Sequence, residues 1–300
     1  MSVPSPASDV ARNDAPHRQV SRDALRGSPA ARAWADWKET RRLWRLGVRL
    51  GWLDIRLRYR GSALGPFWLT ITSALMVASM GVLYSKLFHM QLVSYLPFLS
   101  LSLTLWSVGF SSLIQESCTC FLDAEDMVRS VRLPFLLYAV RVVVRNAIVF
   151  AHNIVVPLGV FALYHLWPGM DALLAIPALV LWGLDGFAAC MLFGSLCARF
   201  RDVAPIIGAL LQIVFYVTPV IWMPQQLGPR AAYLLYNPFY PLLEIVREPL
   251  LGHVPSLQIW GIALATSVVF WLIAVRSFIR VRSLSLIHIS EPTRLALISY

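Results

Sequence analysis

The stretch Asp54-Ile-Arg-Leu-Arg-Tyr-Arg-Gly-Ser-Ala-Leu-Gly-Pro-Phe-Trp68 contains the transition that decides the fold of this chain. Its charged part ends at Arg60, and no Asp, Glu, Lys or Arg follows before Lys86. A basic amphipathic segment that leads directly into an apolar one of this length is typical of a membrane-surface helix followed by a transmembrane helix. The stretch therefore predicts a chain embedded in a lipid bilayer.

The composition supports the same conclusion. Of the 300 residues, 58% are hydrophobic and 14% are charged, whereas about a quarter of the residues in soluble domains carry a charge. The net charge is +10, and a basic excess can indicate nucleic-acid binding. Here the arginines lie beside tryptophans and an apolar segment, which indicates anionic lipid at a cytoplasmic membrane surface. We expect a lipid bilayer as the partner of this region, and no nucleic acid.

The region before the first apolar segment divides into two parts. Residues 1–32 are rich in Ser, Pro, Ala and Arg without a hydrophobic period, which predicts a disordered cytoplasmic tail. In residues 33–60, tryptophans from Trp34 to Trp52 recur at helical spacing, with arginines on the other side. This pattern predicts an amphipathic helix that lies in the membrane interface.

Six apolar segments follow, and they predict an all-α integral membrane protein with residues 61–282 as its transmembrane domain. At about 1.5 Å per residue, each segment is long enough to cross a hydrocarbon core of roughly 30 Å. The six expected spans are residues 63–88, 95–114, 136–163, 172–197, 204–222 and 256–275.

The distribution of basic residues predicts the orientation. Most arginines between the spans fall on the same side as the N-terminus, and Lys86, Arg230 and Arg247 fall on the opposite side. Because basic residues are retained in the cytoplasm, we expect both termini there.

The segment between the fifth and sixth spans, residues 223–255, differs from a solvent-exposed loop. It holds two short apolar stretches separated by Asn237-Pro238, each too short to cross the bilayer. We expect a re-entrant pair of half-helices in the outer leaflet, since irregular backbone is tolerated there when it lines a cavity. A folded loop on the membrane surface is the alternative.

Residues 283–300 change in character. The sequence Leu284-Ser-Leu-Ile-His-Ile-Ser-Glu-Pro-Thr-Arg294 resembles a translated sequencing adapter. We expect that the natural C-terminal sequence is missing after about Ser283. A short cytoplasmic tail is the alternative.

Two features of the composition limit the chemistry. The only lysines are Lys38 and Lys86, and neither follows a glycine, so the chain has no P-loop and another subunit must bind any ATP and Mg²⁺. Cys118-x-Cys120 has no nearby histidine, and the other two cysteines fall in a span. We therefore expect neither a disulfide, nor a metal site, nor a cofactor in this chain.

Several short motifs occur in a fixed order along the chain. They are Arg58-Tyr-Arg-Gly-Ser-x-Leu-Gly-Pro-x-Trp68, Leu133-Pro134, Cys197-Ala-Arg-Phe-Arg-Asp202, Phe215-Tyr-Val-Thr-Pro-Val-Ile-Trp222, Asn237-Pro-Phe-Tyr240 and Arg247-Glu-Pro-Leu-Leu-Gly252. At these topological positions, the pattern over residues 37–282 resembles the permease subunits of ABC-2 type exporters, specifically the polysaccharide and O-antigen group. The basic-aromatic tail with which that family ends is absent here.

The resemblance implies a function and partners. Such permeases form homodimers in the bacterial inner membrane and bind two copies of a nucleotide-binding ABC ATPase subunit. They export an undecaprenyl-linked glycan, such as O-antigen or a capsule-like polysaccharide. The chain would then be a transport subunit and not an enzyme, with ATP hydrolysis in the partner.

The resemblance also suggests residues that couple the permease to the ATPase. The cytoplasmic loop 116–134 matches the docking element of the family, and the turn after the fourth span is a second candidate. The candidate coupling residues are Glu116, Asp123, Glu125, Asp126, Arg129, Arg132, Arg199, Arg201 and Asp202. A solvated loop, and for the turn a charge that only sets topology, are the alternatives.

Substrate access is expected at the cytoplasmic mouth, because guanidinium groups match the phosphate oxygens of a lipid carrier. Two glycines there would let the backbone turn into the first span. The candidates are Arg56, Arg58, Tyr59, Arg60, Gly61, Gly65, Trp68, Arg141 and Arg145. Arginines that only reach toward lipid headgroups are the alternative.

Two further groups of residues are candidates. Along an outer glycan path, or in an ordinary interfacial belt, lie Trp222, Tyr236, Asn237, Pro238 and Tyr240. Inside the membrane, His152 and Asp185 fall at similar depth in the third and fourth spans, so we expect a polar pair with either a structural or a functional role.

The sequence is also compatible with two other functions. The same architecture would serve an ABC-2 permease for another lipid or a drug. A membrane enzyme that modifies lipid-linked sugars would need paired carboxylates or a His/Asp site at the surface, whereas the outer Glu244 and Glu248 flank Arg247.

Overall fold

The computed structural model describes residues 28–61, 65, 67–123 and 133–288, and every regular element in these residues is a helix. The prediction of an all-α protein is confirmed. The helices are α3 (Pro29–Arg58), α4 (Phe67–Leu87), α5 (Leu92–Leu103), η1 (Thr104–Ser111), α6 (Ser112–Thr119), α8 (Phe135–Asn153), α9 (Val155–Tyr164), η2 (Met170–Leu174), α10 (Ala175–Ala189), η3 (Cys190–Gly194), α11 (Ser195–Arg199), α12 (Val203–Val217), η4 (Pro224–Tyr236), α13 (Phe239–Leu250) and α14 (Leu257–His288). The two predicted tails, 1–32 and 283–300, lie largely outside the described residues.

Within the described residues, five helical runs are long and apolar enough to cross a bilayer. They are Phe67–Leu87, Leu92–Thr119, Phe135–Tyr164, Met170–Arg199 and Leu257–Val281. These runs correspond to the first, second, third, fourth and sixth predicted spans, with small shifts at their ends.

The fifth predicted span corresponds to the shorter α12. This helix has 15 residues, which gives a length of roughly 22 Å. The helix ends before Trp222, the predicted end of the span, because Thr218 already has extended backbone with ψ 138°. Thr218 precedes Pro219, and the proline ring disfavours helical backbone in the residue before it.

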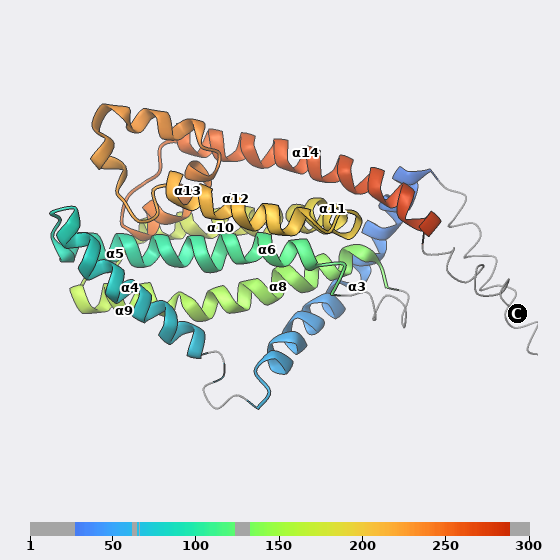
Figure 1. The fold of residues 1–300 in the computed structure, drawn as a ribbon, viewed down its shortest axis with the longest axis horizontal. Coiled ribbons are helices and arrows are strands. Elements are labelled where there is room, and N and C mark those ends of the chain that lie inside the picture. Colours follow the sequence, from blue (N-terminus) through green and yellow to red (C-terminus); the bar gives the residue numbers. More distant parts are fainter. Residues whose placement is uncertain (1–27, 62–64, 66, 124–132, 289–300) are drawn as a thin grey trace, which may run out of the picture.

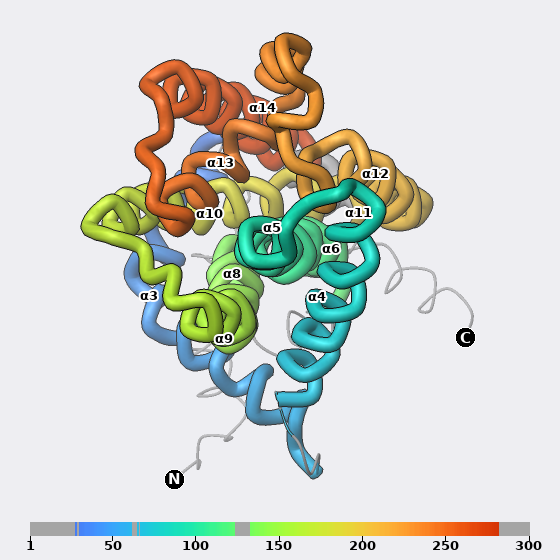
Figure 2. The backbone as a smooth tube through the Cα atoms, turned by 90° about the vertical axis from the view of Figure 1, so that its left-hand side faces the viewer, coloured from blue at the N-terminus to red at the C-terminus, as the bar shows by residue number. Residues whose placement is uncertain are grey.

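The run from α5 through η1 to α6 forms the centre of the bundle. Figure 2 looks along the long axis and shows α5 and α6 enclosed by α4, α8, α10 and α12. Tyr95, Leu99 and Leu105 of this run are fully buried, and they share one hydrophobic cluster with Trp182 of α10. The chain has π-helical turns at η1 and η3, inside two of the long runs.

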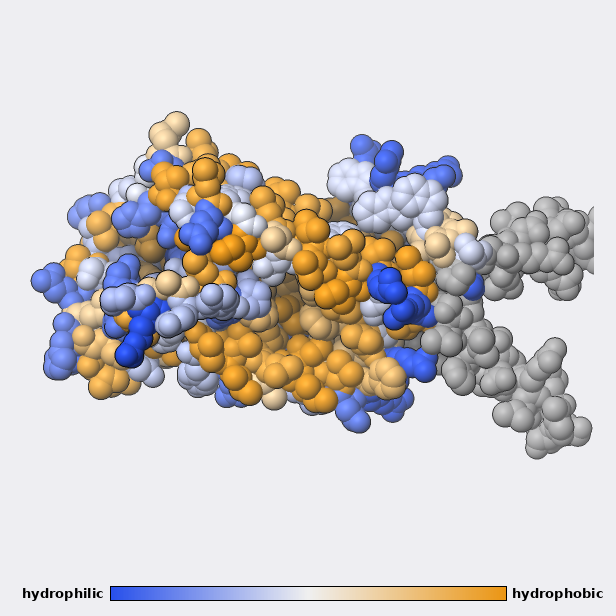
Figure 3. All heavy atoms as spheres, turned by 90° about the horizontal axis from the view of Figure 1, so that it is seen from above, coloured by the Kyte–Doolittle hydropathy of each residue, from blue (hydrophilic) through white to orange (hydrophobic). Residues whose placement is uncertain are grey.

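The two ends of the bundle differ. Figure 1 places α3, the start of α8, the turn between α11 and α12 and the C-terminal part of α14 at one end, and η4 toward the other. We call these the charged end and the opposite end. Figure 3 shows a broad apolar band between hydrophilic side chains at the two ends, as expected for a protein surrounded by lipid.

Helix α3 packs along α8 at the charged end. Its buried positions are Asp36, Thr40, Gly47, Gly51 and Ile55, which recur at helical spacing on one face. The tryptophans lie on other faces and are exposed in the isolated chain, for example Trp34 and Trp52. The tryptophans therefore mark the outward side of α3, while a separate face, made mainly of small and polar residues, makes the contact with the bundle.

Two glycines allow the close approach of α3 to α8. A Cβ added at Gly47 would lie 2.8 Å from a Val140 methyl, and one at Gly51 would lie 2.8 Å from the backbone oxygen of Arg141. A backbone oxygen cannot rotate away as a side chain can. The spacing of the two glycines is the small-xxx-small pattern by which helices approach closely in membranes.

Two short helices, η4 and α13, connect α12 to α14, and the break between them falls at Asn237-Pro238 as predicted. Helix α13 is almost wholly buried. The preceding η4 is a 3-10 helix interrupted at Gly228, where φ is 54°. Leu234 is the buried residue of η4, so most of this segment lies on the surface.

We predict that Gly51→Leu lowers the free energy of unfolding of the detergent-solubilised protein by about 2 kcal/mol, because overpacking against a backbone atom forces α3 away from α8. Thermal unfolding measures the change. Gly159→Leu is the matched control, since no atom lies within 4 Å of a Cβ built there. Equal effects of the two substitutions would show that the α3–α8 contact is not closely packed.

Candidate functional site: a charged cluster where α3 meets the bundle

Charged side chains from three helices meet beneath the C-terminal end of α3. The carboxylate of Asp54 accepts two hydrogen bonds from Arg141, one from Nε at 2.6 Å and one from Nη2 at 2.8 Å. It also accepts a hydrogen bond from Nη1 of Arg145 at 3.3 Å. A bidentate arginine–carboxylate pair of this kind is the strongest geometry available to two such side chains.

Glu116 of α6 connects this pair to the centre of the bundle. Its Oε2 accepts hydrogen bonds from Nε of Arg145 at 2.9 Å and from Asn146 at 2.6 Å. Its Oε1 lies 3.2 Å from Nη2 of Arg58. We call Asp54, Arg58, Glu116, Arg141, Arg145 and Asn146 the charged cluster.

The charged cluster is largely removed from water. The Arg145 side chain is 8% exposed and the Asp54 side chain 13% exposed, whereas Arg58 at the edge remains 45% exposed. Removing one member of a buried ion pair is costly because the remaining charge is left without its partner or water. The cluster therefore fixes α3 against α6 and α8 in one position.

A second contact from α3 orients the start of α8. The carboxylate of Asp36 accepts hydrogen bonds from the backbone N–H groups of Phe135 and Leu136, both at 3.1 Å. A carboxylate at a helix N-terminus satisfies donors that have no partner inside the helix and interacts favourably with the helix dipole. Helix α3 thus holds α8 at two places.

The candidates for substrate access separate into two sets. Arg58, Arg141 and Arg145 are paired with carboxylates of the charged cluster. Arg56 in the last turn of α3 and Arg60 in the turn that follows are exposed, with Tyr59 partly buried between them.

The chain then turns toward α4. Gly61 and Gly65 have φ of 82° and 54°, a conformation that suits glycine, and Trp68 in the first turn of α4 is exposed.

The residues proposed to couple the permease to an ATPase also lie in different surroundings. Glu116 belongs to the charged cluster, and Asp123 accepts a hydrogen bond from Thr119 at 2.7 Å. Arg199, Arg201 and Asp202 are exposed at the turn between α11 and α12. Glu125, Asp126, Arg129 and Arg132 lie outside the described residues.

At the opposite end, the side chain of the candidate Asn237 forms hydrogen bonds within the protein. Its Nδ2 donates to Thr218 Oγ1 at 2.9 Å, and its Oδ1 accepts from the backbone N–H of Phe239 at 3.0 Å. Asn237 thereby joins the end of α12 to the start of α13.

The other candidates there differ in exposure. Tyr236 is 85% exposed, Tyr240 is buried, and Trp222 donates to the backbone oxygen of Tyr216. Pro238 lines a cavity in the bundle.

The expected pair of His152 and Asp185 is not formed. The His152 ring packs edge-on against Phe67, with ring centres 5.6 Å apart. Asp185 instead accepts a hydrogen bond from Ser267 of α14 at 2.7 Å. The similar depth of two residues in sequence does not determine which way each side chain points.

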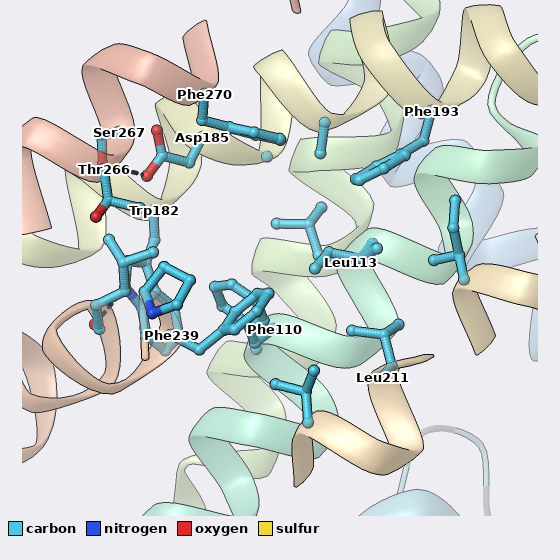
Figure 4. Close-up of a pocket in the computed structure, with 18 of the residues that line it drawn as sticks. Phe110, Leu113, Trp182, Asp185, Phe193, Leu211, Phe239, Thr266, Ser267 and Phe270 are labelled. Carbon is cyan, nitrogen blue, oxygen red and sulfur yellow. Dashed lines mark hydrogen bonds between the residues drawn. The ribbon is translucent and has the colours of Figure 1, made fainter. Parts of the chain in front are cut away.

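Asp185 lies at the wall of an apolar cavity of about 290 Å³. Figure 4 shows Phe110, Trp182 and Phe239 around it, with Asp185 and Ser267 together at one wall. Within the described residues, no group of His, Cys, Asp and Glu has the arrangement of a metal site.

The central structural position of Arg247 was not predicted from the sequence. Its side chain is 1% exposed, and its guanidinium pairs with Glu244, donates to Ser102 Oγ and to the backbone oxygen of Pro219, and lies over the ring of Phe98. These contacts join α13 to α5 and to the end of α12. The only sequence signal was that two acids flank an arginine in an apolar segment.

The described residues thus form a bundle of apolar helices long enough to cross a bilayer, with an amphipathic helix held to one end by ion pairs. This defines a multi-pass membrane protein. Residues 48–251 match the ABC-2 type transporter family. The chain belongs to this family and is a membrane subunit of a transport system.

Curated relatives of the chain are named as permeases of an export system. The chain is 25% identical over 224 residues to the O-antigen export system permease protein RfbA of Myxococcus xanthus, which covers 73% of this chain and 85% of the relative. It is 20% identical over 227 residues to a protein of the same name from Klebsiella pneumoniae, covering 75% and 87%.

We predict that Asp54→Asn lowers the free energy of unfolding by about 3 kcal/mol, because Arg141 and Arg145 both lose a charged partner in a mostly buried site. Thermal unfolding in detergent measures the loss. Asp202→Asn, at an exposed turn, is the control and should change stability by less than about 0.5 kcal/mol. Similar values for the two variants would contradict a stabilising charged cluster.

For the opposite end we predict that Arg247→Met is strongly destabilising, whereas Arg247→Met combined with Glu244→Leu recovers at least half of the loss. The single change leaves Glu244 buried without its cation, and the double change leaves no buried charge from the pair. A double-mutant cycle of unfolding free energies gives the coupling. If the losses of the two single variants simply added in the double variant, Arg247 and Glu244 would not stabilise the fold as a coupled ion pair.

Proposed function

We propose that the chain is the permease of an ATP-driven exporter that carries a lipid-linked polysaccharide, of the O-antigen or capsule-like kind, across the bacterial inner membrane. The observation that carries the proposal is the arginine-rich end of α3. Arg56 in the last turn of α3 and Arg60 just after the helix are exposed before the first membrane helix, and relatives of the chain are named O-antigen export permeases.

The proposed topology has six spans with both termini in the cytoplasm. The charged end is then the cytoplasmic one, in agreement with the retention of basic residues on that side. Helix α12 would complete a sixth crossing together with the extended residues that follow it. Helices η4 and α13 would form the re-entrant pair of the outer leaflet, supported by the burial of α13.

The proposed assembly contains two copies of this chain and a separate ATPase. The absence of a P-loop in the sequence requires another subunit for ATP binding. Helix α4 has little buried surface in the isolated chain, so one of its apolar faces is available for a second copy.

The proposed mechanism uses the arrangement of α3. The phosphate groups of an undecaprenyl-linked glycan would meet Arg56 and Arg60, whose guanidinium groups can each form two parallel hydrogen bonds to phosphate oxygens. Glu116 lies in the last turns of α6, which ends at Thr119 and leads into the loop that holds the proposed docking element. A displacement of this loop by the ATPase would therefore act directly on the charged cluster and on α3.

A second candidate function is favoured by the cavity beside Asp185. A volume of about 290 Å³ with an almost wholly apolar lining suits a small hydrophobic molecule and not a polysaccharide. An ABC-2 permease for another lipid or a drug would use such a site.

We predict that Arg56→Gln/Arg60→Gln reduces surface polysaccharide at least about tenfold in cells that depend on this chain, because one charge-assisted contact to phosphate is worth about that factor. Immunoblots of surface and intracellular glycan measure export, and lipid-linked glycan should accumulate inside. Arg45→Gln/Arg49→Gln, exposed on the same helix, is the control. Unchanged export at normal membrane levels would reject phosphate contact by these arginines.

A further inference from the structure

The apolar cavity in the bundle contains one ionisable side chain, which the proposed export of a glycan does not use. Among the described residues that line the cavity, Asp185 is the only Asp, Glu, Lys, Arg or His. It belongs to the membrane run Met170–Arg199 and is 9% exposed. An ionisable group inside a membrane is costly to bury, and such groups mark sites of function.

The carboxyl group of Asp185 is only half satisfied. Ser267 Oγ donates a hydrogen bond to Oδ2 at 2.7 Å (Figure 4), whereas Oδ1 is buried and accepts no hydrogen bond from the described residues. None of the ion pairs in the described part of the chain includes Asp185. A buried carboxylate without a cation carries a large desolvation cost. The cavity therefore offers an unused acceptor and an unmet need for positive charge.

Aromatic rings form another part of the lining. Phe110 packs edge-on against Trp182 and against Phe239, with ring centres 5.6 Å and 5.4 Å apart, and all three residues line the cavity (Figure 4). Trp182 and Asp185 are three residues apart on α10, so they share a face of that helix. Because the face of an aromatic ring attracts a cation, the rings and the carboxyl group favour the same kind of ligand.

Two wide helical turns border the cavity. The π-helical η1 contributes Gly109 and Phe110 to the lining, and the π-helical η3 contributes Phe193. Turns of this kind are rare and frequently occur at functional sites. They give a reason, independent of charge, to regard the cavity as a binding site.

The volume of the cavity limits the size of its ligand. It measures about 290 Å³. An apolar cavity of about 150 Å³ in another protein binds benzene, so this cavity has room for roughly twice as many heavy atoms. A single aromatic ring with a short alkyl chain and one polar group has this size.

We propose that the cavity binds a small hydrophobic amine, with its ammonium group at Asp185 and its apolar body against Phe110, Trp182 and Phe239. An alkylamine is protonated at neutral pH, so it donates to Oδ1 and also supplies the counter-charge, which a neutral alcohol does not. Binding of such an amine follows from the cavity alone, whereas its transport rests on the second candidate function proposed above.

The test is a titration of the detergent-purified full-length chain with phenylbutylamine, followed by the rise in thermal unfolding midpoint that a ligand of the folded state causes. Phenylbutanol has the same number of heavy atoms but no charge. It should bind about tenfold more weakly, the difference expected for one charge-assisted contact. In Asp185→Asn this preference for the amine should disappear. Asp171→Asn, on the same membrane run but outside the lining, is the matched control and should keep the preference.

A second variant tests the location of the ligand without changing Asp185. Val214 of α12 is partly buried and lines the cavity, so Val214→Trp fills part of the space and should abolish binding of both the amine and the alcohol. Equal affinities of the unmodified chain for the two ligands would overturn the proposal. An unchanged affinity for the amine in Asp185→Asn or in Val214→Trp would also overturn it.

Transport is tested separately from binding. ATP-dependent uptake of radiolabelled phenylbutylamine is measured in inverted membrane vesicles from cells that contain this chain and its ATPase. Binding without uptake would support the amine site and reject the second candidate function for this ligand. Absence of binding would overturn the amine site and leave the proposed export of a glycan unaffected.

Discussion

The paired charges of Asp54, Arg141, Arg145 and Glu116 join an amphipathic helix to the apolar bundle, and the geometry of the whole charged end depends on them. Hydrophobic burial cannot specify this contact, because in a bilayer the lipid is as apolar as the helices. Apart from Ile55, the buried positions of α3 are accordingly polar or small, among them Asp36, Gly47 and Gly51. Ion pairs in a dry site are directional, and they determine both the angle and the register of α3 on α8.

At the opposite end a buried ion pair also joins helices, and there it holds α13 in place. Arg247 and Glu244 hold α13 against α5 and the end of α12, and Trp182 donates to the backbone oxygen of Leu242 at 2.8 Å. Between these two polar regions the helices are apolar, and two of the long runs contain π-helical turns. Wide turns of this kind often mark functional positions, since they interrupt regular hydrogen bonding.

Much of the fold followed from the order of apolar and charged segments. The five long helical runs and the break at Asn237-Pro238 were predicted because hydrophobic length and proline act locally along the chain. Helix α12 ends before the predicted end of the fifth span, and the cause, Pro219, is visible in the sequence. The partners of Arg141 and Arg145 could not be predicted, because Asp54 and Glu116 lie far away in the sequence and only the packing of α3 and α6 on α8 brings them close. For the same reason the depth of His152 and Asp185 did not reveal that Asp185 faces Ser267 on α14.

The most direct test of the central claim is the distance between α3 and α8 in the membrane. Spin labels at two exposed positions, Arg49 on α3 and Ala147 on α8, can be placed in a chain whose four buried cysteines are replaced, and the distance measured by pulsed electron resonance in nanodiscs. We expect one narrow distance distribution for the chain with an intact charged cluster. For Asp54→Asn we expect an additional distribution that is broader and centred at a longer distance. The same narrow distribution in both proteins would show that α3 is held by other contacts and that the charged cluster does not determine its position.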